Sequence, residues 1–144
     1  MIETDNIHAT CVAIDGDGIL ILGKSGAGKS DLALRLIENK QAILVSDDRT
    51  DVRVLKGRIV ATAPNLLKGL MEVRGVGIIK TEYLDKVDVK LVVNLVSDLK
   101  ELDRMPEEKS YILNGTNVPM LNVYPFEVSA TDKVVIKLKA NLEK

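Results

Sequence analysis

Aromatic side chains are scarce in this sequence of 144 residues, which has three tyrosines, one phenylalanine and no tryptophan. So few rings cannot form a stacking platform for the bases of single-stranded nucleic acid. An excess of positive charge is also absent, because 20 basic and 21 acidic residues give a net charge of −1. No overall basic field is therefore available to attract nucleic acid or an anionic membrane. We expect a protein with no nucleic-acid partner and no membrane partner.

Cysteine occurs only once, as Cys11, which excludes both a disulfide and a cysteine-based metal centre within one chain. Because Cys11 stands in the apolar stretch 9–13, we expect a buried structural thiol. Long hydrophobic runs are missing too, since no apolar run approaches the length of a membrane-spanning helix. Residues 1–5 have neither the basic nor the apolar part of a secretory signal. These absences predict a cytoplasmic protein.

Hydrophobic residues make up 46% of the chain, which is enough for the core of a single domain over residues 1–144. The pattern of apolar and turn-forming residues predicts a strand-rich chain. The expected elements are strands at 7–14, 19–22, 42–45 and 87–96, a hairpin over 51–62, extended chain over 111–123, helices at 31–39 and 64–71, and a loop or strand at 72–80. The tail from Thr131 fits either a strand or a helix, because Val134-Val135-Ile136 favours the first and the spacing of Val134, Leu138 and Leu142 the second.

The strongest motif fits the pattern G-x-x-x-x-G-K-[ST], which is typical of a loop that binds phosphate groups. Glycines allow backbone conformations in which successive N–H groups converge on an anion. The lysine supplies a point charge for the terminal phosphates, and the final hydroxyl can bind a phosphate-associated Mg²⁺. An apolar run precedes the motif and an amphipathic run follows it, as in a strand–loop–helix unit. The predicted phosphate-binding residues are Gly23, Lys24, Ser25, Gly26, Ala27, Gly28, Lys29 and Ser30. With so few aromatic rings, we expect a bound adenine to be held loosely and the phosphates to carry the specificity.

Two adjacent carboxylates, Asp47 and Asp48, follow the apolar strand predicted at residues 42–45. Beside a nucleotide, one carboxylate can hold Mg²⁺ and the other can take a proton from an attacking hydroxyl. A third motif, at residues 71–79, combines Glu72 and Arg74 with two glycines. On its own this third motif would also fit a tight surface turn.

Taken in this order, the three motifs resemble the core of the HPr kinase/phosphorylase family. The run 72–79, Glu-Val-Arg-Gly-Val-Gly-Ile-Ile, is the most specific part of the resemblance. Residues 7–10, Ile-His-Ala-Thr, resemble the family's histidine-bearing first strand, and residues 102–105, Leu-Asp-Arg-Met, resemble its downstream Asp-Arg segment. The resemblance covers about residues 7–105.

The resemblance implies an α/β fold in which the P-loop lies in a mixed sheet with flanking helices, similar to the core of phosphoenolpyruvate carboxykinase. A mixed sheet agrees with the antiparallel hairpin predicted just before the loop. The resemblance further implies transfer of phosphate from ATP or pyrophosphate, with Mg²⁺, to a serine of the phosphocarrier protein HPr. The reverse phosphorolysis and assembly as a homohexamer are implied in the same way.

The family motifs also imply a role for each matching residue. Lys29 would clamp the β- and γ-phosphates, while Ser30 and Glu72 would bind Mg²⁺ with help from Asp47. Asp48 would act as general base in phosphorylation and as general acid in the reverse direction. His8 and Arg104 would lie near the transferred phosphate or near the carboxylate pair, and Arg74 would help to shape the site. By residue type alone, His8 would be an ordinary core histidine and Arg104 an ordinary surface arginine.

The sequence departs from the larger family members at both ends. We find no room for their separate N-terminal domain, so the chain resembles the compact, catalytic form. Their Gly-Arg-Asn loop and long C-terminal helix are not recognisable either, and residues 124–130, Tyr-Pro-Phe-Glu-Val-Ser-Ala, stand in that region. Since the resemblance implies that this region touches HPr, a related kinase that acts on another small protein or a metabolite is the alternative function.

Two other nucleotide-binding classes fit the sequence less well. A small GTPase would need an Asn-Lys-x-Asp motif, which is absent, and its Asp-x-x-Gly motif would follow the phosphate loop. Here the only Asp-x-x-Gly, residues 15–18, precedes the loop. A small nucleotide kinase would need an arginine-rich lid, which this short chain does not contain.

Overall fold

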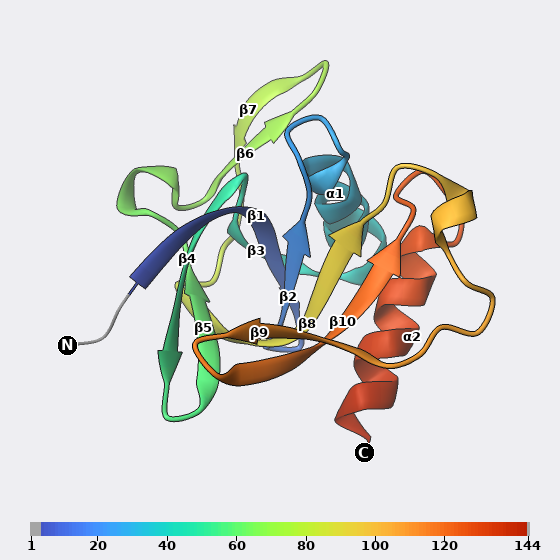
Figure 1. Ribbon diagram of the computed structural model, residues 1–144. Helices are drawn as coiled ribbons and strands as arrows, with labels where there is room; N and C mark the ends of the chain where they lie inside the picture. Colours follow the sequence, from blue (N-terminus) through green and yellow to red (C-terminus); the bar gives the residue numbers. More distant parts are fainter. Residues whose placement is uncertain (1–3, 144) are drawn as a thin grey trace.

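The chain starts with an antiparallel hairpin in the computed structural model, which describes residues 4–143 (Figure 1). Strand β1 (Thr4–Ile14) pairs with β2 (Asp17–Leu22) in a register that runs from Ala9 opposite Leu22 to Ile14 opposite Asp17. The two residues between the strands, Asp15 and Gly16, have φ values of 51° and 82°. Positive φ at both positions is what a two-residue hairpin loop of type I′ requires, and Asp and Gly accept it readily. The predicted hairpin is confirmed.

The other elements follow the predicted order closely. Helix α1 (Lys29–Lys40) succeeds the glycine-rich loop, and the strands after it are β3 (Ile43–Ser46), β4 (Arg49–Leu55), β5 (Arg58–Thr62), β6 (Leu70–Val73), β7 (Gly77–Lys80), β8 (Lys86–Leu95), β9 (Lys109–Leu113) and β10 (Thr116–Val123). Helix α2 (Ala130–Leu142) ends the described chain, and two single 3₁₀ turns, η1 (Asn65–Leu67) and η2 (Leu99–Glu101), interrupt the connections.

The main sheet is mixed, as predicted, and five of its strands pair in a ring. Strand β1 pairs with β2 and β4, β4 with β5, β5 with β8, and β8 returns to β2. Within the ring β2–β8 is the parallel pair and the others are antiparallel; outside the ring, β10 pairs with β8 and is also parallel to it. In an arrangement of this kind, the carboxyl ends of β2, β8 and β10 lie at the same edge, where α/β sheets commonly bind ligands.

Apolar side chains pack on both faces of this sheet. On one face lies a core whose fully buried residues all come from strands and include Cys11, Leu20 and Ile59. On the other face, α1 and α2 lie side by side and cover a second core that includes Ile21, Leu36 and Leu138 (Figure 1). Within residues 4–143, neither helix is long and apolar enough to cross a membrane.

One segment differs from its predicted structure, and a second segment, for which two structures were possible, is now assigned. The helix predicted over 64–71 is wrong, because only η1 is helical and Gly69, with a φ of 72°, turns the chain into β6. Strand β6 then pairs with β7, so that residues 70–80 form a separate hairpin. The tail is a helix rather than a strand, since Ala130, Val134 and Leu138, spaced four residues apart, are buried in the helix-covered core. A C-terminal helix is therefore present, although the sequence alone did not reveal it.

Cys11 provides a simple test of the strand-built core. Its side chain is 0% exposed, and burial raises the pKa of its thiol from 9.0 to about 12. Since only the thiolate is nucleophilic, we expect native protein at pH 8 to resist a thiol reagent such as dithionitrobenzoate and to react fully after unfolding in guanidinium chloride. Unfolding exposes the thiol, which can then ionise near its ordinary pKa of 9.0. We therefore expect the free energy of unfolding to be unaffected by Cys11 below pH 9.0 and to fall as the pH rises towards 12. Rapid labelling of the native protein would contradict the buried position of Cys11.

Candidate active site

The glycine-rich loop joins β2 to α1 and ends at an uncapped helix N-terminus. Gly26 and Gly28 have φ values of 82° and 105°, which residues with a Cβ rarely adopt. Gly28 is the N-cap residue of α1 and offers no side-chain cap, so the first N–H groups of the helix are left available to a ligand. These N–H groups and the positive end of the helix make this loop suited to an anion.

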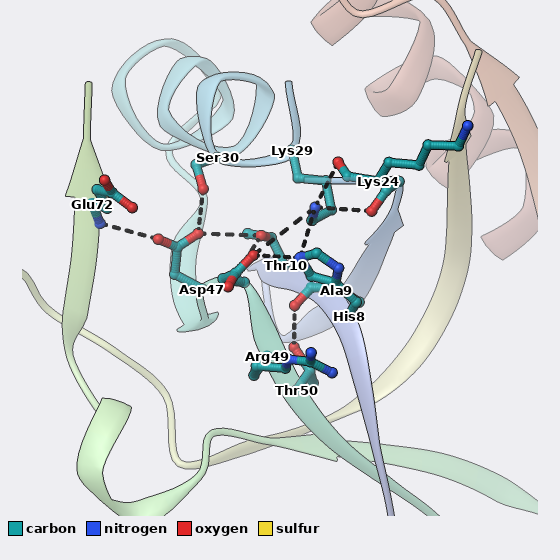
Figure 2. Close-up of polar contacts among 12 residues, drawn as sticks. His8, Ala9, Thr10, Lys24, Lys29, Ser30, Asp47, Arg49, Thr50 and Glu72 are labelled. Carbon is teal, nitrogen blue, oxygen red and sulfur yellow. Dashed lines mark hydrogen bonds and ion pairs between the residues drawn. The ribbon is translucent and has the colours of Figure 1, made fainter. Parts of the chain in front are cut away.

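Lys29 is buried at the base of the loop, with a side chain only 4% exposed. Its Nζ donates hydrogen bonds to the carbonyl oxygens of Gly23, at 2.9 Å, and Lys24, at 3.1 Å. The same Nζ lies 3.4 Å from Nε2 of His8 and 4.0 Å from Oδ1 of Asp48 (Figure 2). Burial lowers the pKa of Lys29, while the charges of Asp48 and Asp47 oppose this shift. The ammonium group is therefore fixed in place, with carboxylates on one side and the loop on the other.

The position of the two aspartates follows from a change of partner along β1. Residues 11–13 of β1 pair with β3, and residues 4–8 pair with β4. The turn between β3 and β4 therefore falls opposite Ala9 and Thr10, where the ladder is interrupted. Asp48 adopts a left-handed conformation in this turn, with a φ of 66°. Aspartate is among the few residues other than glycine that tolerate this conformation, which directs Asp48 away from the sheet ladder.

Asp47 is held on three sides. Its Oδ1 accepts hydrogen bonds from the hydroxyls of Ser30, at 2.6 Å, and Thr10, at 3.2 Å, and its Oδ2 accepts one from the backbone N–H of Glu72, at 3.0 Å (Figure 2). The residue is 7% exposed. Asp47 thus connects the first turn of α1, strand β1 and strand β6 through one carboxylate.

Asp48 differs from its neighbour, because its side chain is 60% exposed and lines a cavity. Oδ1 of Asp48 lies 2.7 Å from Nε2 of His8, and its backbone N–H donates to the hydroxyl of Thr10 at 3.1 Å. Nε2 of a neutral histidine can donate to Asp48 or accept from Lys29, but not both, and the shorter contact favours donation to Asp48. Asp47 is therefore held by hydrogen bonds within the protein, whereas Asp48 is accessible to a ligand.

A cavity of about 410 Å³ lies over the N-terminus of α1. Its wall is formed by residues of the loop and of α1, by the aspartate turn, by β6, and by one residue from the chain between β10 and α2. Those residues are Ser25, Gly26, Gly28, Lys29, Ser30, Asp31, Leu34, Asp48, Glu72, Val73, Arg74 and Phe126. The cavity thus brings together side chains from four separate stretches of the sequence.

Most of the predicted site residues meet at this cavity. Five of the eight predicted loop residues line it, namely Ser25, Gly26, Gly28, Lys29 and Ser30, together with Asp48, Glu72 and Arg74. Gly23 and Lys24 do not line the cavity but accept hydrogen bonds from Lys29, and Ala27 is not among the lining residues either. His8 contacts Asp48, and Asp47 is bonded to Ser30. Arg104 is different: it is exposed in the segment between η2 and β9 and is not among the lining residues. Its role near a transferred phosphate stays a prediction.

The donor set behind the cavity suits a magnesium ion that arrives with phosphate groups. Among residues 4–143, no three His, Cys, Asp or Glu side chains are grouped closely enough to hold a metal ion. Mg²⁺ in nucleotide sites needs only one or two protein oxygens, because phosphates and waters complete its octahedron. The Ser30 hydroxyl and the Asp47 carboxylate, already in contact, are oxygen donors of this kind. Glu72 approaches Asp47 through its backbone N–H, while its side chain lines the cavity.

Two residues of the site were missed in the sequence. Thr10 contacts both aspartates, and its position two residues after His8 on the same strand face was a usable signal. Phe126 gives the cavity an aromatic wall, but nothing in its local sequence indicates that the chain after β10 returns to the loop.

Comparison with known proteins gives concordant results. The family model described as HPr Serine kinase C-terminal domain matches residues 1–142. An HPr kinase/phosphorylase of Lactobacillus acidophilus (strain ATCC 700396 / NCK56 / N2 / NCFM) is 34% identical over 149 residues, which cover 96% of this chain and 46% of the relative. One from Peptoclostridium acidaminophilum is 36% identical over 134 residues, covering 92% of this chain and 42% of the relative. The solved structure of the Hpr(Ser) kinase/phosphatase from Coxiella burnetii matches with a TM-score of 0.79 at 26% identity, over 96% of both chains. The chain spans about half the length of the curated relatives that it matches.

Proposed function

The chain belongs to the HPr kinase/phosphorylase family, and on this basis we propose that it transfers the γ-phosphate of ATP to a serine of HPr. The proposal includes Mg²⁺ as the metal, pyrophosphate as an alternative donor, and the reverse phosphorolysis. The main observation in support of this function is that the two aspartates have different environments. Asp47 is buried and bonded to Ser30, whereas Asp48 faces the cavity beside Lys29.

In the forward reaction, a carboxylate oxygen of Asp48 takes the proton of the serine hydroxyl as the serine oxygen attacks the γ-phosphorus. The bond between the γ-phosphorus and the bridging oxygen breaks, and ADP leaves with the electron pair. His8, 2.7 Å from Asp48, orients the carboxylate. In the reverse direction, the protonated Asp48 returns the proton to the serine oxygen.

The loop and Lys29 supply the electrostatic part of the mechanism. The N–H groups at the start of α1 and the ammonium of Lys29 are fixed before the reaction, so they stabilise the charge on the phosphoryl oxygens without reorganising. Ser30 and Asp47 would hold Mg²⁺ together with the phosphates, and Glu72 would contribute from β6. The metal would neutralise phosphate charge when bound.

Transfer of labelled γ-phosphate to purified HPr tests the proposed function. We expect label on a serine of HPr in the presence of ATP and Mg²⁺, and its release as pyrophosphate when inorganic phosphate is added afterwards. Tight ATP binding without labelling of HPr would contradict the acceptor and favour another small protein or a metabolite. Absence of both ATP binding and labelling would contradict the function as a whole.

Ser30 and Thr10 offer a matched pair of variants for the proposed metal site. Both hydroxyls donate to the same oxygen of Asp47, but only Ser30 lies on the cavity wall. We expect Ser30→Ala to raise the Mg²⁺ concentration for half-maximal phosphoryl transfer by about tenfold or more, because a metal-binding group is lost. Thr10→Val should lower the rate through misplacement of Asp48 and leave the Mg²⁺ dependence nearly unchanged. Equal shifts in both variants would remove Ser30 from the proposed metal site.

The family resemblance also leads us to propose a homohexamer in the cytoplasm. Light scattering coupled to size-exclusion chromatography tests this directly, and a stable monomer at micromolar concentration would contradict the assembly.

A further inference from the structure

Phe126, the only phenylalanine of the chain, lies on the wall of the cavity rather than in either core. It belongs to the chain between β10 and α2, and 63% of the residue is exposed. The ring of Tyr124 lies edge-on to it, with ring centroids 5.6 Å apart and an interplanar angle of 79°. This T-shaped contact holds Phe126 next to Tyr124, and most of the Phe126 surface still remains exposed to an incoming ligand.

The backbone just before Phe126 is held against helix α1, close to the end of the glycine-rich loop. Nη2 of Arg35 donates a 2.5 Å hydrogen bond to the carbonyl oxygen of Pro125, and Nε of the same arginine donates to Asp31 at 3.1 Å. A Cβ on Gly28 would lie 3.3 Å from Pro125 and 3.5 Å from Cζ of Phe126, so this glycine allows the close approach. The ring is therefore attached to the first turns of α1 and keeps its place beside the loop.

The cavity has two chemically different parts. Lys29, Asp48 and the loop backbone make one part polar and suited to phosphate. Phe126 and Leu34, which lies one turn along α1 from Ser30, add apolar surface to the same cavity. A ligand that combines phosphates with a flat aromatic group matches this division.

Resting on the proposed function, we infer that Phe126 and Leu34 form the subsite for the base of the nucleotide donor. The base stacks on the exposed face of Phe126 while the phosphates occupy the loop. Stacking of a base on an aromatic side chain contributes enough binding energy for its removal to weaken affinity by about tenfold. This inference revises the expectation that a scarcity of aromatic residues leaves the base loosely held, because one well-placed ring is sufficient.

Pyrophosphate provides the decisive comparison, because it carries the phosphates and lacks the base. We would measure the dissociation constants of Mg·ATP and Mg·pyrophosphate by isothermal titration calorimetry for wild type and Phe126→Ala. We expect the substitution to weaken Mg·ATP about tenfold and to leave Mg·pyrophosphate within twofold of wild type. Phe126→Tyr, which keeps the ring, should bind both ligands as wild type does.

Val128→Ala is the matched control, since Val128 is 98% exposed in the same segment and does not line the cavity. It should leave both constants unchanged. Unchanged ATP affinity in Phe126→Ala, or equal weakening of both ligands, would overturn the inference. If Phe126→Ala instead lowers only the affinity for the protein acceptor, the ring belongs to a protein-docking surface and the base subsite is rejected. Failure of wild type to bind either ligand would overturn the proposed phosphate site itself, an outcome distinct from the failure of the base subsite.

Discussion

Asp48→Asn is expected to abolish phosphoryl transfer while ATP affinity stays close to that of wild type. Asparagine has nearly the same shape and accepts the left-handed conformation of residue 48, where φ is 66°, so the turn should survive. Its amide cannot take a proton from the acceptor hydroxyl. Loss of a general base typically lowers a rate by about 10² to 10⁴-fold. The measurement is the single-turnover rate of γ-phosphate transfer, together with the dissociation constant of ATP.

Asp51→Asn is a suitable control, because Asp51 lies on β4, the strand that follows the turn with Asp48, and is bonded to Asn6 outside the cavity. It should transfer phosphate at the rate of wild type. Full activity in Asp48→Asn would remove Asp48 from the role of general base. A loss of ATP affinity equal to the loss of rate would instead mean that the carboxylate contributes to binding.

Lys29→Ala is expected to reduce transfer by about 10²-fold or more, because a preorganised positive charge beside the phosphates is lost. Part of the loss should appear as weaker binding of ATP and pyrophosphate alike. The substitution also removes the donor to the carbonyl oxygens of Gly23 and Lys24. We therefore expect greater motion of the loop, which amide hydrogen exchange over residues 23–28 can detect.

Lys40→Ala tests whether these effects are specific, because Lys40 lies at the opposite end of α1 in an exposed ion pair with Asp132. It should retain the rate and the affinities of wild type. Turnover at the wild-type level in Lys29→Ala would exclude the glycine-rich loop from the mechanism.

Local sequence patterns predicted those parts of the molecule that local interactions determine. The turn at Asp15 and Gly16 and the amphipathic run after the loop specify the first hairpin and α1 without reference to the rest of the chain. The Asp47-Asp48 pair was recognisable because carboxylates at the end of an apolar strand are rarely placed there by packing alone. Separate roles for the two carboxylates were implied only by the family resemblance. The burial of Asp47 and the exposure of Asp48 were not predicted, since they depend on the break in the β1 ladder opposite Thr10.

The wrong or missing predictions share a physical cause: the structure of each of these segments depends on contacts with residues far away in the sequence. Residues 64–71 contain one 3₁₀ turn after Pro64, but pairing with β7 places Leu70 and Met71 in strand β6. The tail had two consistent patterns, and only the burial of Val134 and Leu138 against the sheet selects the helix. Phe126 lies beside the loop because Arg35 binds the carbonyl oxygen of Pro125 and Gly28 leaves room for the ring. No local sequence pattern predicts these contacts.

The ring of strands also limits the order in which this domain can fold during synthesis. Asp17 pairs with Asp88 and Leu22 with Asn94, so β2 remains without its parallel neighbour until β8 has emerged from the ribosome. The glycine-rich loop, which directly follows β2, therefore lacks one of its supports for much of translation. Pairings between such distant segments also slow folding, because a long loop must close before any contact is gained. A nascent chain that ends before β8 should thus contain every residue of the phosphate loop and both aspartates, and still be unable to bind a nucleotide.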